Sequence, residues 1–186
     1  MNRLPIAGLA LAIPECQSYL GTLAKNPPAL PARGRVARMV QVHSAIEIDA
    51  PVATVFAYID DYTTATKWVA GMKDWKPVGE KIQGLGSVFA AKIGVGPTTL
   101  DATLEITRWE QDHVIAWEPR KGVKQSGSYV LEDIGDGRTR FTLDIDLELP
   151  GGIVGRTLGK GMEPIIRSQI AHSATLLKEQ VEALGS

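Results

Sequence analysis

The chain has 186 residues, of which 44% are hydrophobic, and 20 Lys and Arg against 21 Asp and Glu give a formal net charge of −1. A chain of this length buries a core of its own and is near the usual size of one domain. Its basic residues are scattered, so the basic stripe that binds a phosphate backbone is missing and we expect no nucleic-acid partner. The single cysteine, Cys16, excludes an internal disulfide and a metal site built from cysteines. These features favour a cytoplasmic protein.

Residues 1–38 differ from the rest of the sequence. Residues 4–13 are an apolar run that is too short for the roughly 20 residues that span a bilayer. The run resembles an export signal, but Glu15 stands where a cleavage site needs a small residue, so export is only the alternative to a cytoplasmic location. Residues 26–34 are rich in proline and typical of a stiff linker. We therefore interpret 1–38 as an apolar segment and a linker, with residues 1–33 offering a contact to a partner or a membrane surface.

The first elements predicted after this segment are a strand and two short helices. Apolar and polar side chains alternate over residues 40–48, which predicts a strand. Pro51 stands where a helix begins, because its missing N–H is one of the donors that a first helical turn leaves unpaired. Residues 52–60 then repeat apolar side chains at helical spacing, and a second short helix is predicted over residues 63–68.

A run of strands is predicted next. Residues 100–107 and 141–149 alternate strictly between apolar and polar side chains, which is typical of strands with one wet and one covered face. Such strands belong to antiparallel sheets. Shorter strands are predicted over residues 87–93, 113–118 and 124–131. Gly135-Asp136-Gly137 is a compact turn signal that joins the last two strands.

The C-terminal segment predicts a long amphipathic helix after Pro150-Gly151-Gly152. One apolar stripe at helical spacing holds Leu158, Met162, Ile165, Ile166, Ile170, Leu177, Val181 and Leu184. The covered faces of the strands are the only surface large enough to bury this stripe. A strand, two short helices, a run of antiparallel strands and a final helix make up an α+β order of elements.

Together these elements resemble the START-like (SRPBCC) superfamily, in its polyketide cyclase/dehydrase and lipid-transport group, with the coenzyme-Q-binding proteins closest in character. The landmarks span about residues 39–184 and are Ile48-Asp49-Ala50-Pro51, Val55-Phe56, Lys67-Trp68, Gly127-Ser128-Tyr129-Val130-Leu131 and Gly151-Gly152. The resemblance implies a helix-grip fold, in which a curved antiparallel sheet wraps around a long C-terminal helix and two short helices follow the first strand. It also implies that residues 39–186 form one ligand-binding domain.

Members of this superfamily hold a small hydrophobic molecule, such as a lipid, a quinone or a polyketide, in a cavity between sheet and helix. The ligand-binding residues that this resemblance implies are Trp68, Trp75, Phe89, Leu100, Leu104, Trp117, Tyr129, Leu143, Ile145, Met162, Ile166, Gln169 and Ser173. Gln169 and Ser173 are polar groups on a covered face and need partners, either a ligand oxygen or a nearby backbone group. Without the resemblance, an apolar side chain on a covered face is core more often than ligand wall.

Signals of catalysis are few. His43, His113 and His172 are not spaced like metal ligands, no phosphate-binding loop is present, and we expect neither a metal nor a cofactor. The leading hypothesis is a non-catalytic carrier or sensor of a hydrophobic molecule. Two alternatives stay open: a polyketide cyclase or aromatase, with Tyr129 as the best candidate for an acid or base, and an interaction module filled by its own side chains. The sequence leaves open which ligand binds, whether a reaction occurs, the oligomeric state and the role of residues 1–38.

Overall fold

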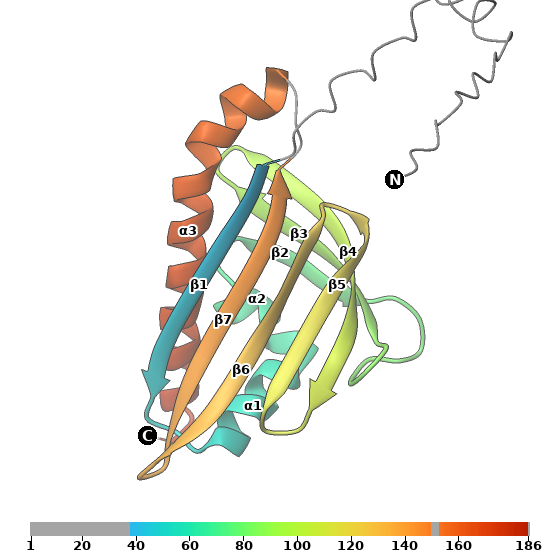
Figure 1. Ribbon diagram of the computed structural model, residues 1–186. Helices are drawn as coiled ribbons and strands as arrows, with labels where there is room; N and C mark the ends of the chain where they lie inside the picture. Colours follow the sequence, from blue (N-terminus) through green and yellow to red (C-terminus); the bar gives the residue numbers. More distant parts are fainter. Residues whose placement is uncertain (1–37, 150–152, 186) are drawn as a thin grey trace, which may run out of the picture. The chain divides into compact units, whose positions relative to one another are not determined.

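The computed structural model describes residues 38–149 and 153–185, with side chains placed for residues 39–148 and 163–185. The elements in chain order are β1 (Arg38–Ile48), α1 (Val52–Asp60), the 3₁₀ turn η1 (Tyr62–Thr64), α2 (Ala65–Trp68), β2 (Met72–Pro77), β3 (Val88–Val95), β4 (Thr98–Glu110), β5 (Val114–Gly122), β6 (Gln125–Gly135), β7 (Arg138–Leu149) and α3 (Ile153–Glu182). Within these residues, seven antiparallel strands form one curved sheet in the order β1-β7-β6-β5-β4-β3-β2, and α3 lies against it (Figure 1). The predicted α+β helix-grip fold is confirmed.

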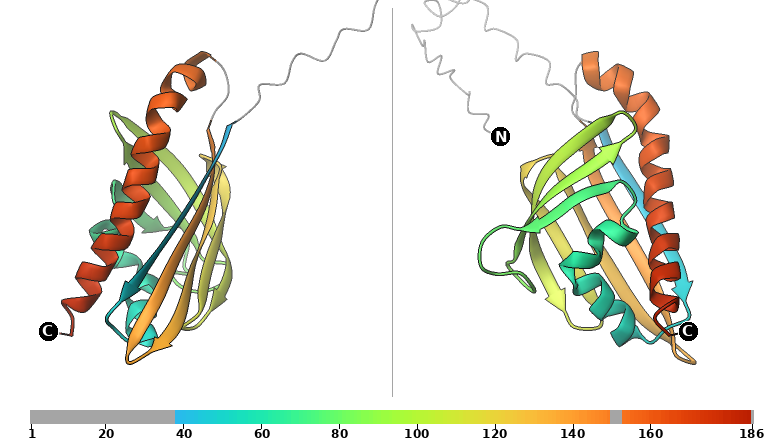
Figure 2. Two further views of the ribbon diagram at one scale, coloured as in Figure 1. Left: turned by 60° about the vertical axis from the view of Figure 1, so that its left-hand side comes forward. Right: turned by 180° about the vertical axis from the view of Figure 1, so that it is seen from behind.

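The first and last strands of the chain are neighbours in the sheet. β1 pairs antiparallel with β7 over its whole length, and α3 then returns along β1, as Figure 2 shows. On the outer face of this pair, Gln41 donates a hydrogen bond to Asp146, and His43 Nδ1 lies 2.7 Å from an oxygen of Asp144. The carboxylates that alternate along β7 are therefore held by polar neighbours on the solvent side, as the alternation predicts.

The two short helices close the gap between β1 and β2. In α1, Val55, Phe56 and Ile59 are buried at the predicted helical spacing. Asp61 ends α1 and begins η1. Its carboxylate caps η1, because it accepts a hydrogen bond from the backbone N–H of Thr63 at 2.9 Å. The second predicted helix is thus divided into η1 and α2. Trp68, the last residue of α2, is buried.

β2 was not among the predicted strands. It is only six residues long, ends in Pro77 and mixes lysines with large apolar side chains, so it carries no clean alternation. The neighbouring pair β4–β5 contains two register shifts, at Thr103/Leu104 and at Ile106/Arg108. Such bulges bend a strand and increase its twist. They curve this half of the sheet away from a flat packing surface.

α3 buries most of its predicted stripe against the sheet. Its buried residues are Ile166, Ile170, Ser173, Ala174, Leu177 and Val181. The prediction was wrong for Leu184, which is 62% exposed because the helix ends at Glu182, and for Ile165, which is 37% exposed. Ile165 precedes Ile166 by one position, about 100° around the helix axis, and this rotation carries it off the buried face. The side chains of Leu158 and Met162 lie outside the described residues. No helix in the described ranges is long and apolar enough to cross a membrane.

Candidate functional site

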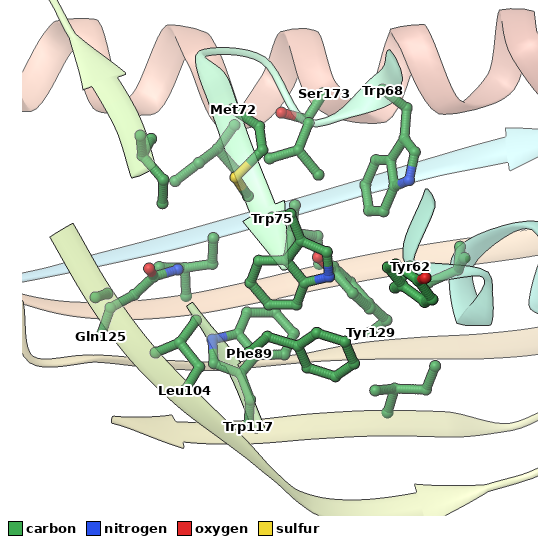
Figure 3. Close-up of a pocket in the computed structure, with 18 of the residues that line it drawn as sticks. Tyr62, Trp68, Met72, Trp75, Phe89, Leu104, Trp117, Gln125, Tyr129 and Ser173 are labelled. Atoms are coloured by element: carbon green, nitrogen blue, oxygen red, sulfur yellow. The ribbon is translucent and has the colours of Figure 1, made fainter. Parts of the chain in front are cut away.

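A cavity of about 150 Å³ lies between the inner face of the sheet and helices α2 and α3 (Figure 3). Its wall contains every predicted site residue whose side chain is described, namely Trp68, Trp75, Phe89, Leu100, Leu104, Trp117, Tyr129, Leu143, Ile145, Ile166, Gln169 and Ser173. Met162, the remaining predicted residue, lies outside the residues whose side chains are described. The structure therefore brings these side chains together around one space, while their binding of a ligand stays a prediction.

Tyr129 lies at the centre of the aromatic part of the wall. Its ring centroid is 5.3 Å from that of Trp68 and 4.7 Å from that of Trp117. Gly127 makes room for this arrangement, since a Cβ atom there would lie 2.5 Å from Cζ2 of Trp117. A side chain at this position of β6 would push the indole away from the strand. The glycine in the predicted landmark Gly127-Ser128-Tyr129 thus positions a cavity residue on the neighbouring strand.

A second aromatic pair lies on the strands at the other edge of the sheet. The rings of Trp75 on β2 and Phe89 on β3 stack with centroids 4.8 Å apart and an angle of 11° between their planes. Tyr62 approaches Phe89 from η1 at 6.2 Å. These rings form a flat apolar surface on the cavity wall, of the kind that a planar ligand contacts well.

The polar groups of the aromatic wall are hydrogen-bond donors. The indole nitrogens of Trp68 and Trp117 are buried and have no hydrogen-bond partner among the described residues. Burial raises the pKa of the Tyr129 hydroxyl, so this group stays protonated at neutral pH. Figure 3 shows Tyr129 among the side chains that line the cavity. The wall can therefore donate hydrogen bonds to a bound molecule.

Gln169 and Ser173 have protein partners. Gln169 Nε2 donates to the carbonyl of Gly94 at 2.9 Å. Ser173 accepts a hydrogen bond from the backbone N–H of Ala70 at 2.9 Å and donates to the carbonyl of Gln169 at 2.8 Å. The sequence left open whether these side chains bond to a ligand oxygen or to a backbone group. In the structure both bond to the backbone. They tie α3 to the end of β3 and to the segment after α2, and so fix the height of the cavity.

One part of the cavity wall is formed by the loop between β2 and β3, which contributes Gln83, Gly84 and Ser87. Gln83 in this loop donates a hydrogen bond to Asp60 at the end of α1, and Trp109 on β4 donates to the other oxygen of Asp60 at 2.8 Å. Ser87, which is fully buried, donates to the carbonyl of Gly84 at 2.7 Å and holds the base of the loop. Asp60 is the only charged residue of the cavity wall in the described part of the chain. The bond from Gln83 holds the loop to the end of α1, and the bond from Trp109 holds the same carboxylate to β4.

The described residues contain no cluster of three or more His, Cys, Asp or Glu that is placed to hold a metal ion. The three histidines lie away from the cavity. His43 pairs with Asp144 on the outer face, His113 lies in a turn with Nδ1 3.3 Å from the carbonyl of Leu131, and His172 is exposed on α3. The chemistry that this wall offers is enclosure, stacking and hydrogen-bond donation.

Sequence reasoning missed several residues of the wall, among them Tyr62, Met72, Gln83 and Gln125. Gln125 had a usable signal, because it is four positions from Tyr129 on the same strand and so points to the same face. Met72 belongs to the unpredicted strand β2. Gln83 lies in a loop, where no periodicity indicates which side chain turns inward.

Solved structures with similar folds cover about four fifths of this chain. A protein of Thermus thermophilus is 19% identical with a TM-score of 0.69, over 79% of this chain and 100% of its own. An aromatase/cyclase from Streptomyces sp. R1128 is 16% identical with a TM-score of 0.64, over 78% and 94%. A START superfamily protein from Mycobacterium smegmatis is 18% identical with a TM-score of 0.58, over 77% and 98%. At these identities the likeness shows the fold.

No sequence match was found among curated proteins. The sequence pattern of one family, however, matches residues 39–182, which include all of α3 and the whole sheet except Arg38, the first residue of β1. This range contains all the described residues that surround the cavity. The chain therefore belongs to the polyketide cyclase / dehydrase and lipid transport family.

Proposed function

We propose that residues 39–186 form a domain that binds a small hydrophobic molecule in this cavity and acts as its carrier or sensor. The observation that carries the proposal is an interior space walled by aromatic and aliphatic side chains, in a domain with an extensive buried core. An apolar ligand that enters such a space leaves water, which contributes about 25 cal/mol for each Å² of apolar surface removed. The family's description, which includes lipid transport, supports this function.

A cyclase or aromatase function is the second candidate, and the Tyr129 hydroxyl inside the cavity is the observation that favours it. The similar fold of an aromatase/cyclase also supports it. With its pKa raised by burial, Tyr129 would act as a proton donor and not as a base at neutral pH. If the chain converts a polyketide-like substrate, Tyr129→Phe should abolish turnover and leave binding in place. Equal turnover in both forms would show that Tyr129 is not the proton donor, and absence of turnover in the wild type would leave the carrier function alone.

The experiment that tests the binding function is native mass spectrometry of the purified chain, followed by organic extraction of what it releases. Ala102, which lines the cavity, is changed to Phe to fill the space. Ala90 faces the other side of the same sheet and receives the same change as a control. We expect an apolar molecule at near one-to-one stoichiometry in the wild type and in Ala90→Phe, and its loss in Ala102→Phe. Equal capture by both variants would show that the ligand binds elsewhere.

An interaction module with a filled interior remains the third possibility, and we propose that residues 1–33 would then carry the contact. Deletion of residues 1–33 separates this function from ligand binding. A carrier whose site lies wholly in residues 39–186 should capture the same molecule at the same stoichiometry after the deletion. Loss of association with a partner or a membrane surface, together with an empty cavity in both forms, would instead support the interaction module.

A further inference from the structure

Two hydrogen-bond donors in the cavity wall have no acceptor. The indole nitrogens of Trp68 and Trp117 are buried and make no hydrogen bond with any residue that the structure describes. The two side chains are only 2% and 5% exposed, so bulk water does not satisfy them. A buried donor without a partner costs folding free energy, and native proteins contain few of them. Because both side chains border the cavity, a molecule in the cavity is the partner closest at hand.

The two donors lie on either side of a third. The Tyr129 ring contacts both indoles, and its hydroxyl makes no hydrogen bond with the described residues. An indole N–H only donates, so a matching molecule must present an acceptor oxygen or nitrogen. Both indole rings line the cavity, so a molecule in it lies against the rings that carry the two N–H groups. The two indoles of the aromatic wall are thus complementary to an acceptor on the bound molecule.

The charge of the wall excludes one class of acceptor. In the described part of the chain, no Lys, Arg or His lines the cavity, and the single charged residue is the acidic Asp60. A carboxylate in this space would lose its hydration without gaining a positive partner, which is a large cost in an apolar interior. A carbonyl or ether oxygen accepts the same hydrogen bonds without that cost. The favoured molecule is therefore neutral.

The shape of the wall favours rings. Trp75 and Phe89 present a stacked, nearly coplanar pair, and the rings of Trp68, Trp117 and Tyr129 surround the opposite side. Planar aromatic molecules pack well against such surfaces. A cavity of about 150 Å³ lined by apolar side chains is known to hold a benzene ring. The space thus suits one or two fused rings.

We propose that the cavity selects a neutral aromatic molecule that carries a carbonyl oxygen, which accepts a hydrogen bond from the indole N–H group of Trp68 or of Trp117. The class contains aryl ketones and quinones, and it excludes fatty acids and aromatic carboxylates. This selectivity rests on the binding function proposed above and specifies its ligand.

The test uses three molecules of nearly equal shape: 2-acetylnaphthalene, 2-ethylnaphthalene and 2-naphthoate. Their affinities for the full chain are measured by isothermal titration calorimetry. We expect the ketone to bind about ten-fold more tightly than the hydrocarbon, since it gains a hydrogen bond, and the carboxylate to bind most weakly. Equal affinity for ketone and hydrocarbon would overturn the selectivity while leaving the hydrophobic binding function intact. Tightest binding by the carboxylate, or failure of all three to bind, would also overturn it, whereas the binding function itself is tested by the mass spectrometry described above.

Tryptophan variants identify the donors. Trp68→Phe and Trp117→Phe each remove one N–H, and the variant that loses the donor to the carbonyl should show a several-fold lower preference for the ketone while the hydrocarbon keeps its affinity. Trp109→Phe is the matched control, because Trp109 donates to Asp60 and does not line the cavity. It should keep the full preference. If both cavity variants keep the preference as well, the indole donors are not the recognition groups. Should Trp68→Phe fail to fold, Trp117→Phe and the wild-type series still decide the question.

Discussion

Two regions of the sheet differ in whether their inward-facing side chains fill the interior. Where the C-terminal half of α3 packs on β1 and β7, the interior is filled, and Val40, Phe141, Leu177 and Val181 are at most 1% exposed. Where β2 to β7 curve past α2 and the preceding part of α3, the inward-facing side chains surround an empty space of about 150 Å³. Both regions are built from strands that alternate between covered and wet faces. The alternation therefore decides which face is covered and not whether the covered space is full.

Large rings that brace one another make the difference. In the filled region, branched aliphatic side chains from α3 and β1 interlock. In the cavity region, Trp68, Tyr129 and Trp117 contact each other in a row, and the row ends on Phe141, which lies 5.7 Å from the Tyr129 ring and 6.2 Å from the Trp68 ring. Rings packed in this way resist collapse into the space beside them, because movement of one displaces the next. Phe141 thus marks the boundary between the two regions.

The same substitution in each region should give the largest difference in stability. Leu177 on α3 is fully buried in the filled region, whereas Leu104 on β4 already borders the cavity. We expect Leu177→Ala to lower the free energy of unfolding by about 4 kcal/mol and Leu104→Ala by about 2 kcal/mol, since only the first creates a new void among close-packed neighbours. Urea denaturation at constant m-value measures both. Equal losses would show that the cavity region is as tightly packed as the other.

The sequence predicted most of the strands and helices of both regions but not the shape of the cavity. Strict alternation over residues 100–107 and 141–149 was enough to place one face of each strand inward, and the landmark residues indicated the helix-grip order. The cavity itself depends on ring orientations, on the bulges of β4 and on the absence of a side chain at Gly127, none of which periodicity encodes. Gln169 shows the same limit. Its inward position was predicted, but only the structure places the Gly94 carbonyl within reach of it.

Trp109 and Trp117 allow an indole N–H that has a hydrogen-bond partner to be compared with one that has none among the described residues. Trp109→Phe removes a hydrogen bond to the carboxylate of Asp60, and Trp117→Phe removes an N–H that has no partner among the described residues. Both changes remove the same ring volume. We expect the free energy of unfolding to fall by about 2 kcal/mol in Trp109→Phe, because a bond to a charged group is lost, and by about 1 kcal/mol or less in Trp117→Phe. Thermal unfolding of both variants measures the difference, and a larger loss in Trp117→Phe would mean that its N–H is satisfied in solution.

Two buried hydroxyls provide a smaller contrast. Thr139 on β7 donates to the carbonyl of Ala50 at 2.7 Å and so joins segments far apart in the chain. Ser87 makes its bond to Gly84 within the loop that forms part of the cavity wall. Thr139→Val should lower the free energy of unfolding by about 1.5 kcal/mol, and Ser87→Ala by about 0.5 kcal/mol. Ser87→Ala should, in addition, accelerate ligand release in stopped-flow exchange, because the base of the loop is loosened. Unchanged release would indicate that ligand does not pass this loop.

The smallest effect is a pH dependence of stability at the contact between the end of α3 and the end of β1, in the filled region. Glu182 accepts hydrogen bonds from Lys178 Nζ and from the backbone N–H of Asp49, each at 2.8 Å, and these join the end of α3 to the end of β1. The bond from Lys178, followed by that from Asp49, lowers the pKa of Glu182 below its ordinary value of 4.5. The folded state therefore favours the carboxylate. Its contribution to stability is complete above the unfolded pKa and is lost as pH falls through the lower, folded pKa.

Glu182→Gln tests this dependence by comparison with the wild type. The variant should be slightly less stable at pH 7, and the difference between the two proteins should shrink as pH falls below about 4.5, where the wild-type carboxyl becomes protonated. Other carboxylates contribute equally to both curves and cancel in the difference. Salt should reduce the effect, since the pair with Lys178 is partly exposed. A difference in stability between the two proteins that stays constant from pH 7 to pH 3 would mean that Glu182 supports the contact between α3 and β1 through packing and not through its charge.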